Sequence, residues 1–145
     1  MSKSNTFETD LLNLIFKNID AALIGDAGGL RGSVTAGSLY VGLHTADPGE
    51  AGDQTSSETA YTSYARQAVV RGAGFTVTGN SVSPAANVDF PQCTAVPGTA
   101  ITHFSIGTAV SGVGKLLYSG TVSPNIAMAI GVIPRLTTAT ACTED

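Results

Sequence analysis

The sequence predicts a mainly β fold, an antiparallel β-sandwich of jelly-roll-like type, preceded by one N-terminal amphipathic helix. Helical periodicity occurs only near the start of the chain, whereas residues 38–140 contain short apolar or alternating runs separated by Gly, Pro and Asn. Strands that follow one another without intervening helices favour antiparallel sheets. With 145 residues and no internal repeat, the chain is expected to form a single domain over residues 1–145.

The helix is expected over residues 5–25, where apolar side chains recur every three or four positions. Asn5 and Glu8 have the spacing of a capping box, and Gly25 is a natural end. Leu12 and Phe16 lie off the main apolar stripe and form a second apolar edge. This edge either packs in the core or contacts a partner subunit.

The β region is expected to contain about seven or eight strands with turns between them. Gly72-Ala73-Gly74 predicts a hairpin turn and Ser123-Pro124-Asn125 a second turn. A long polar loop at 45–63 joins the first two strands. The segments that we expect as strands are SLYVGLH (38–44), ARQAVVR (65–71), GFTVTG (74–79), NVDF (87–90), ITHFSIGT (101–108), GKLLYSGTV (114–122) and IAMAIGVIPRL (126–136).

The polar loop contains four of the chain's acids, Asp47, Glu50, Asp53 and Glu58. Oxygen ligands on a loop suit Ca²⁺, but the alternating acidic pattern of a calcium loop is absent. Asp47-Pro48-Gly49 instead predicts a type II turn with the Asp47 side chain as its cap. We therefore expect a solvated loop without a metal, whose four carboxylates are candidates for contact with a partner.

The charge content is low and its sign is negative. Only 12% of residues are charged, with a net charge of −4, against roughly 25% charged residues in a typical soluble domain. Either Ser and Thr solvate the surface or neighbouring subunits cover much of it, and we favour the second. The scattered basic residues argue against nucleic-acid binding. The longest apolar run is too short for a membrane span, and the first residues lack a signal-peptide pattern.

No catalytic or cofactor motif is present. The two histidines, His44 and His103, lie in or beside expected strands, and no GxSxG elbow supplies a nucleophile. The segment GTAVSGVGKLL lacks the first glycine and the hydroxyl of a phosphate-binding loop. We expect no enzymatic activity and no cofactor. Cys93 and Cys142, which lack metal-site spacing, are expected to be ordinary thiols, although a disulfide between them is the alternative.

Two segments resemble a group of virion proteins of tailed bacteriophages. The first is LYVGLHTADPGEAGDQTSSETAYTSYARQAV, with its LHTADPGEAG element, and the second is THFSIGTAVSGVGKLLYSG, residues 102–120. The resemblance implies a structural protein of the particle, of the kind labelled either head decoration (cement) or tail fibre.

From the resemblance we expect a multi-copy capsid decoration protein, made in the host cytoplasm and located on the surface of the phage head. Its partners would be the major capsid protein and further copies of itself as a homo-oligomer, without nucleic acid or membrane. The alternative is a tail-tip or tail-fibre attachment protein. A glycan- or receptor-binding module is a third hypothesis, disfavoured because the chain has no Trp to form an aromatic platform.

Overall fold

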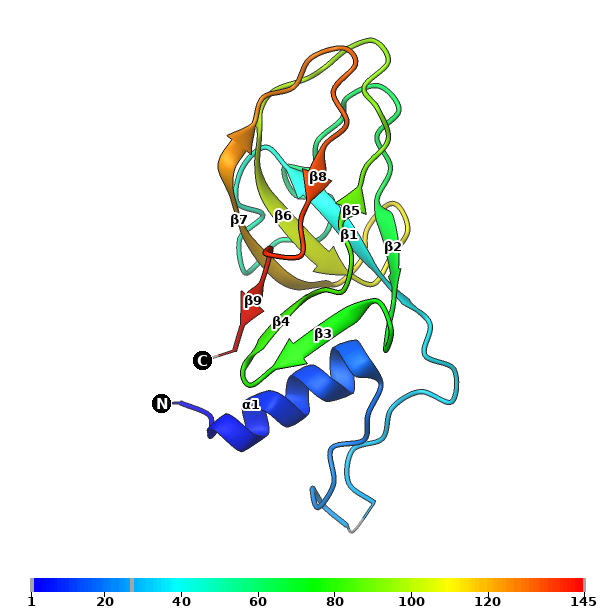
Figure 1. Cartoon of the computed structure of the whole chain (residues 1–145), viewed down its shortest axis with the longest axis vertical. Helices are drawn as coiled ribbons and strands as arrows, with labels where there is room; N and C mark the ends of the chain where they lie inside the picture. Colours follow the sequence, from blue (N-terminus) through cyan, green and yellow to red (C-terminus); the bar gives the residue numbers. More distant parts are fainter. Residues whose placement is uncertain (1, 27, 145) are drawn as a thin grey trace. The chain divides into compact units, whose positions relative to one another are not determined.

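The computed structural model describes residues 2–26 and 28–144 (Figure 1). It confirms a mainly β chain with antiparallel sheets and one N-terminal helical segment. The chain divides into two compact units, each assembled from separate segments. The helix unit comprises Met1–Ser38, Val69–Asn87 and Thr137–Asp145, and the sheet unit comprises Leu39–Ala68 and Val88–Leu136. The single domain over residues 1–145 and the jelly-roll arrangement stay predictions.

The helical segment is shorter than predicted. Helix α1 spans Asn5–Leu12 and continues as a π-helical turn, η1, over Asn13–Lys17. The cap is Ser4 rather than Asn5, because the Ser4 hydroxyl accepts a hydrogen bond from the Phe7 N–H at 3.3 Å. The predicted end at Gly25 is wrong.

The early end of the helix has a local cause at Asn18. Asn18 adopts the left-handed conformation, with φ of 59°, which Asn tolerates better than most residues. Its side-chain amide then bonds both backbone groups of Ser33, each at 2.7 Å. Beyond it the chain forms a hairpin-like arm, closed by the backbone bridge between Ala21 and Leu30.

Leu12 and Phe16 are both core residues of the chain itself. Each has a relative exposure of 0%, and the Phe16 ring meets Phe75 edge to face at a centroid distance of 5.0 Å. This burial corrects the expectation of a partner contact at these positions, because neither side chain is available to a second molecule. The second apolar edge of the helix packs in the core.

The remainder of the helix unit is an antiparallel sheet in the order β3-β4-β9, of strands Phe75–Thr78, Ser81–Pro84 and Cys142–Thr143. The Lys17 ammonium holds η1 beside this sheet by donating to the carbonyls of Gly72 and Phe75, at 2.8 and 2.9 Å. The predicted hairpin across Gly72-Ala73-Gly74 is wrong. The turn exists, with φ of +86° at Gly72, but β3 pairs with β4 and not with the strand before it.

The sheet unit is centred on a four-stranded antiparallel sheet in the order β2-β1-β6-β7. Val41 lies opposite Ile106 and Leu43 opposite Phe104, and all four side chains are buried. The predicted half-buried alternation holds only in the first half of β1, because every residue from Val41 to His44 is buried, on both faces of the strand. The strands of the sheet are β1 Ser38–His44, β2 Gln67–Val70, β6 Ile101–Gly107 and β7 Leu116–Ile126, and a separate pair is formed by β5 Val88–Asp89 and β8 Arg135–Leu136.

Ser123-Pro124-Asn125 does not separate two strands as predicted, since strand β7 runs on to Ile126. The pairing register nevertheless shifts at these residues, from His103 opposite Thr121 to Ile101 opposite Ile126, so they form an irregularity within the strand. Strand β7 lies at the edge of its sheet, where a proline without an N–H removes no required ladder bond. Of the strand predicted over residues 126–136, Ile126 belongs to β7 and Arg135–Leu136 forms β8, while the residues between them are not in a strand. Within the described residues, no helix has the length and apolarity needed to cross a membrane.

Candidate functional site

The polar loop at 45–63 returns alongside the strand from which it starts. The Thr45 N–H donates to the Ser57 carbonyl and the Thr59 N–H to the Leu43 carbonyl, both at 2.9 Å. These bonds surround a short antiparallel bridge between His44, the last residue of strand β1, and Glu58 of the loop. The loop is therefore part of the sheet unit's hydrogen-bonded structure, and only its outer portion is solvated.

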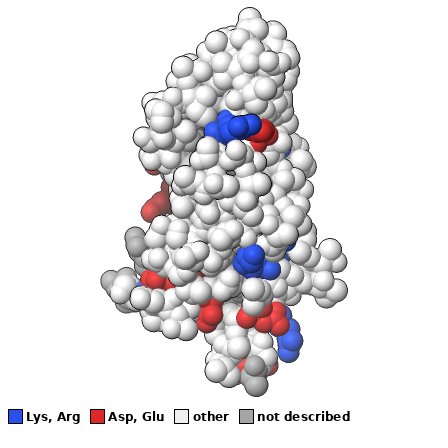
Figure 2. Space-filling view, in the orientation of Figure 1, with Lys and Arg blue, Asp and Glu red and all other residues white. Residues whose placement is uncertain are grey.

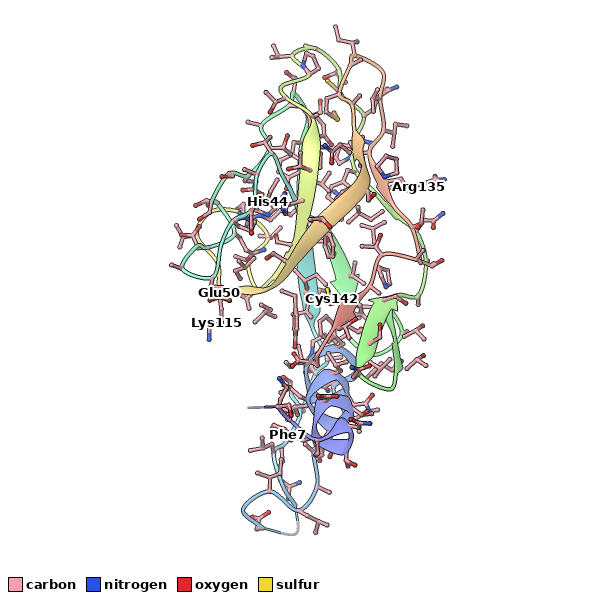
Figure 3. The ribbon with its side chains drawn as sticks, turned by 90° about the vertical axis from the view of Figure 1, so that its left-hand side faces the viewer. Phe7, His44, Glu50, Lys115, Arg135 and Cys142 are labelled. Atoms are coloured by element: carbon pink, nitrogen blue, oxygen red, sulfur yellow. The ribbon has the colours of Figure 1, made fainter. Side chains whose placement is uncertain are left out.

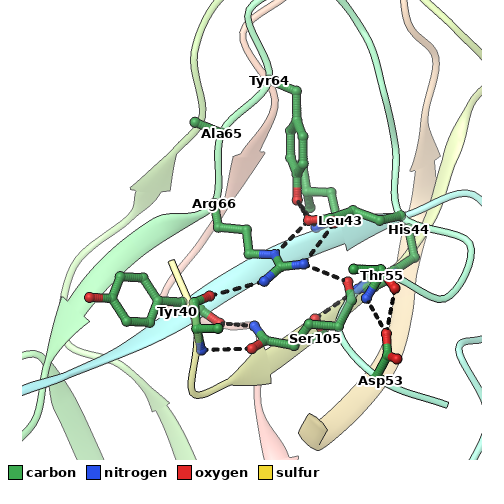
Figure 4. A network of polar contacts seen from close by, with 12 residues as sticks. Tyr40, Leu43, His44, Asp53, Thr55, Tyr64, Ala65, Arg66 and Ser105 are labelled. Carbon is green, nitrogen blue, oxygen red and sulfur yellow. Dashed lines mark hydrogen bonds and ion pairs between the residues drawn. The ribbon is translucent and has the colours of Figure 1, made fainter. Parts of the chain in front are cut away.

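Arg66, which follows the loop in the chain, is the cation around which the loop is organised (Figure 4). Its guanidinium binds the Glu58 carboxylate through two parallel bonds, Nε to Oε1 at 2.6 Å and Nη2 to Oε2 at 2.8 Å. It also donates to the carbonyls of Ala109 and Gln54, each at 3.0 Å. The bonds to Glu58 raise the pKa of Arg66. A bidentate, nearly buried pair of this kind fixes geometry as well as charge.

This pairing corrects the expectation for Glu58. The Glu58 side chain retains 17% of its exposure, and its Oε1 also accepts the Tyr64 hydroxyl at 2.9 Å. Tyr64 in turn accepts the Leu43 N–H at 3.0 Å, and burial raises the pKa of its phenol. Glu58 therefore anchors the loop internally and is not a solvated carboxylate.

Gln54 is an anchor that the sequence analysis missed. Its side chain is fully buried, and its Oε1 accepts the Ala109 N–H at 2.8 Å. A Cβ atom added at Gly107 would lie 2.2 Å from the Gln54 side chain, and one at Gly114 would also lie 2.2 Å from it. Glycines at these two positions make room for the amide, so the glycines of ITHFSIGTAVSGVG were the available signal.

His44 and Ser105 form a further buried contact. The Ser105 Oγ lies 2.7 Å from His44 Nε2, and His44 Nδ1 lies 2.8 Å from the Ser56 carbonyl oxygen. Because a carbonyl can only accept, Nδ1 carries the proton and the Ser105 hydroxyl donates to Nε2. Burial lowers the pKa of His44. A serine beside an imidazole has the form of a nucleophile and base, but both residues are 0% exposed, so no substrate reaches them. The pair instead holds the loop in place through the bond from His44 to the Ser56 carbonyl.

The remaining acids of the loop lie on its outer portion. Asp47 Oδ1 accepts the Gly49 N–H at 2.9 Å, and φ of +72° at Gly49 is the conformation that the predicted turn requires. Asp53 caps a second turn by accepting the Thr55 N–H and hydroxyl, and these bonds lower the pKa of Asp53. Glu50 is exposed at the outer edge of the sheet unit (Figure 3).

The outer portion of the loop lies against the edge strand of the sheet. Asp47, Gly49 and Glu50 line an open groove of about 430 Å³ together with residues 116–119 of strand β7. The groove offers two carboxylates, a tyrosine at 118 and a serine at 119, which suits hydrogen-bond donors and cations of a partner. Among residues 2–26 and 28–144, no three His, Cys, Asp or Glu side chains are grouped so that they could hold a metal.

The model of one protein family matches residues 2–140 of this chain, which is nearly its whole length. That family is described as podophage GP4 fiber I protein gp80. No curated protein matches the sequence. The family match does not single out the LHTADPGEAG element, so the use of that element as a signature stays a prediction.

Proposed function

The chain belongs to the podophage GP4 fiber I protein family, and from this premise we propose that it is a tail-fibre protein that attaches to other subunits of the virion. Family membership makes it a structural component of a tailed phage. The family description names a fibre, and it therefore favours the tail-fibre alternative over the head decoration that we expected first. The match over residues 2–140 is the observation that carries this proposal.

The outer loop at Asp47 to Asp53 is the surface that we assign to this attachment. It is held in place by Arg66, Gln54 and His44 beneath it, so little conformational entropy is lost when a partner binds. No salt bridge among the described residues involves Asp47 or Glu50. Their carboxylates beside the groove therefore suit a partner surface that carries Lys or Arg.

Copy number and position in the virion test the placement. Antibody labelling of purified particles should mark the tail, and quantitative gel analysis should give about a dozen copies or a small multiple of that number. Labelling of the head surface with on the order of hundreds of copies would support decoration instead. That result would overturn the proposed placement without affecting family membership.

The loop contact is tested by adding purified variants to particles assembled without this chain. Asp47→Asn with Glu50→Gln keeps the turn, because the amide oxygen introduced at position 47 can still accept the Gly49 N–H. We expect weaker attachment and a reduced salt dependence of binding. Asp20→Asn with Asp26→Asn is the matched control, since it also removes two charges from exposed acids that accept a backbone N–H, from Gly32 at 2.7 Å and from Gly29 at 2.9 Å. Equal attachment of both variants would exclude the loop as the contact.

A further inference from the structure

One end of the sheet unit has no charged side chain. Three segments contain no Asp, Glu, Lys or Arg, and we call them together the uncharged cap: residues 59–65, 90–102 and 122–134. A typical soluble sequence of this total length would contain about eight charged residues. Figure 2 shows the corresponding end of the sheet unit, which is at the top in Figure 1, as an unbroken white surface on the face in view.

The cap exposes large apolar side chains instead. Val96 is 66% exposed, Ile130 68% and Ile133 54%. The same segments expose the polar but uncharged side chains of Gln92, Thr94 and Thr99. Exposed large apolar side chains together with uncharged polar ones are the composition of a protein–protein contact rather than of an ordinary solvated surface.

The loops of the cap are held together by backbone hydrogen bonds. The Thr62 N–H donates to the Val96 carbonyl at 2.9 Å, and the Cys93 N–H donates to the Val132 carbonyl at 2.9 Å. The Gly131 N–H returns a bond to the Cys93 carbonyl at 2.8 Å. A surface organised in this way loses little entropy on binding, so its apolar area is available for affinity.

Charge decides which partner fits. A charged partner surface would lose hydration against the cap without gaining an ion pair. Copies of this chain have a net charge of −4 and repel one another, except where they meet through a surface without charge. The cap is such a surface, and its exposed apolar side chains can be buried against the same side chains of a second copy without desolvating a charge. We propose that a second copy of this chain docks on the uncharged cap, with the two caps facing each other.

The oligomeric state of the purified chain tests this proposal, independently of where the protein sits in the virion. Sedimentation velocity from about 1 to about 100 µM, which covers contacts of moderate affinity, should show a dimer or a larger assembly. Ile130→Asp and Ile133→Asp should each raise the dissociation constant by more than about tenfold, because each buries an unpaired carboxylate at the contact. Higher salt should not weaken the wild-type assembly, since the contact contains no ion pair.

Val113→Asp is the matched control. Val113 lies in the same unit, is 78% exposed and is not part of the cap, so its variant should assemble as the wild type does. Circular dichroism and thermal unfolding establish that each variant is folded. A wild-type chain that remains monomeric at about 100 µM overturns the proposal. The same conclusion follows if a folded Ile130→Asp chain assembles as well as Val113→Asp.

Discussion

Replacement of Arg66 by alanine is the most direct test of how the polar loop is held. The guanidinium makes four hydrogen bonds, two to the Glu58 carboxylate and one each to the Ala109 and Gln54 carbonyls. Its removal leaves Glu58 with the Tyr64 hydroxyl alone and leaves two carbonyls without this donor. Breaking a buried ion pair costs about 3–5 kcal/mol. Because Glu58 retains some exposure and water can reach it, we expect about 3 kcal/mol.

A second Arg–carboxylate pair in the same unit serves as the control. Arg135 binds Asp89 through Nε and Nη2, but the two side chains are 53% and 48% exposed. Solvent screens such a pair, and the Asp89 carboxylate stays hydrated when its partner is lost. Arg135→Ala should therefore cost only a small fraction of the stability lost in Arg66→Ala, although the two substitutions remove the same side chain.

Urea unfolding followed by circular dichroism measures both costs, and amide hydrogen exchange shows where the structure loosens. In Arg66→Ala, the Thr45 and Thr59 amides that join the loop to strand β1 should exchange faster, while the amides that pair β3 with β4 keep their protection. Glu58→Gln combined with Arg66→Ala should cost less than the sum of the single changes, because the two residues share one interaction. Equal costs for Arg66→Ala and Arg135→Ala, with unchanged exchange at Thr45 and Thr59, would refute the anchoring role.

Two further outcomes concern buried titratable groups. Burial lowers the pKa of His44 from its ordinary value of 6.5, so the unfolded chain takes up this proton first as the pH falls. The contribution of His44 to stability is therefore complete above about pH 6.5 and decreases as the pH falls toward the lower pKa of the folded state. In a plot of the urea midpoint against pH, His44→Gln should reduce this decrease. An unchanged slope would exclude His44 as its source. Cys93 and Cys142 are free and buried, and burial raises the pKa of Cys142 to about 12, so a thiol reagent at about pH 8 should label both only after unfolding. Rapid labelling of the native chain would contradict this arrangement.

Features that depend on neighbouring residues were predictable from the sequence. The alternation of SLYVGLH and ITHFSIGT identifies strands β1 and β6, because successive side chains of a strand point to opposite faces and the apolar ones gather on the core face. The Asp-Pro-Gly turn is equally local, since Pro48 and Gly49 each restrict their own backbone angles. The helix end was predicted wrongly because the prediction used only the local apolar periodicity, which continues past Lys17. In the structure the helix ends at Asn18, whose side chain bonds Ser33 across the arm.

The sequence alone determined the mainly β class, the positions of strands β1 and β6, the Asp47 turn and the shortage of charge, since each follows from residue types and their spacing. Only the tertiary structure decided which acids face solvent and which are structural. In the sequence, Glu58 and Gln54 look like ordinary loop residues. In the fold, Glu58 pairs with Arg66, and Gln54 bonds Ala109, which lies 55 residues away in the chain. The same holds for the uncharged cap, whose three segments meet only in the folded chain. Burial and long-range pairing set the role of a polar side chain, and neither is encoded in its immediate neighbours.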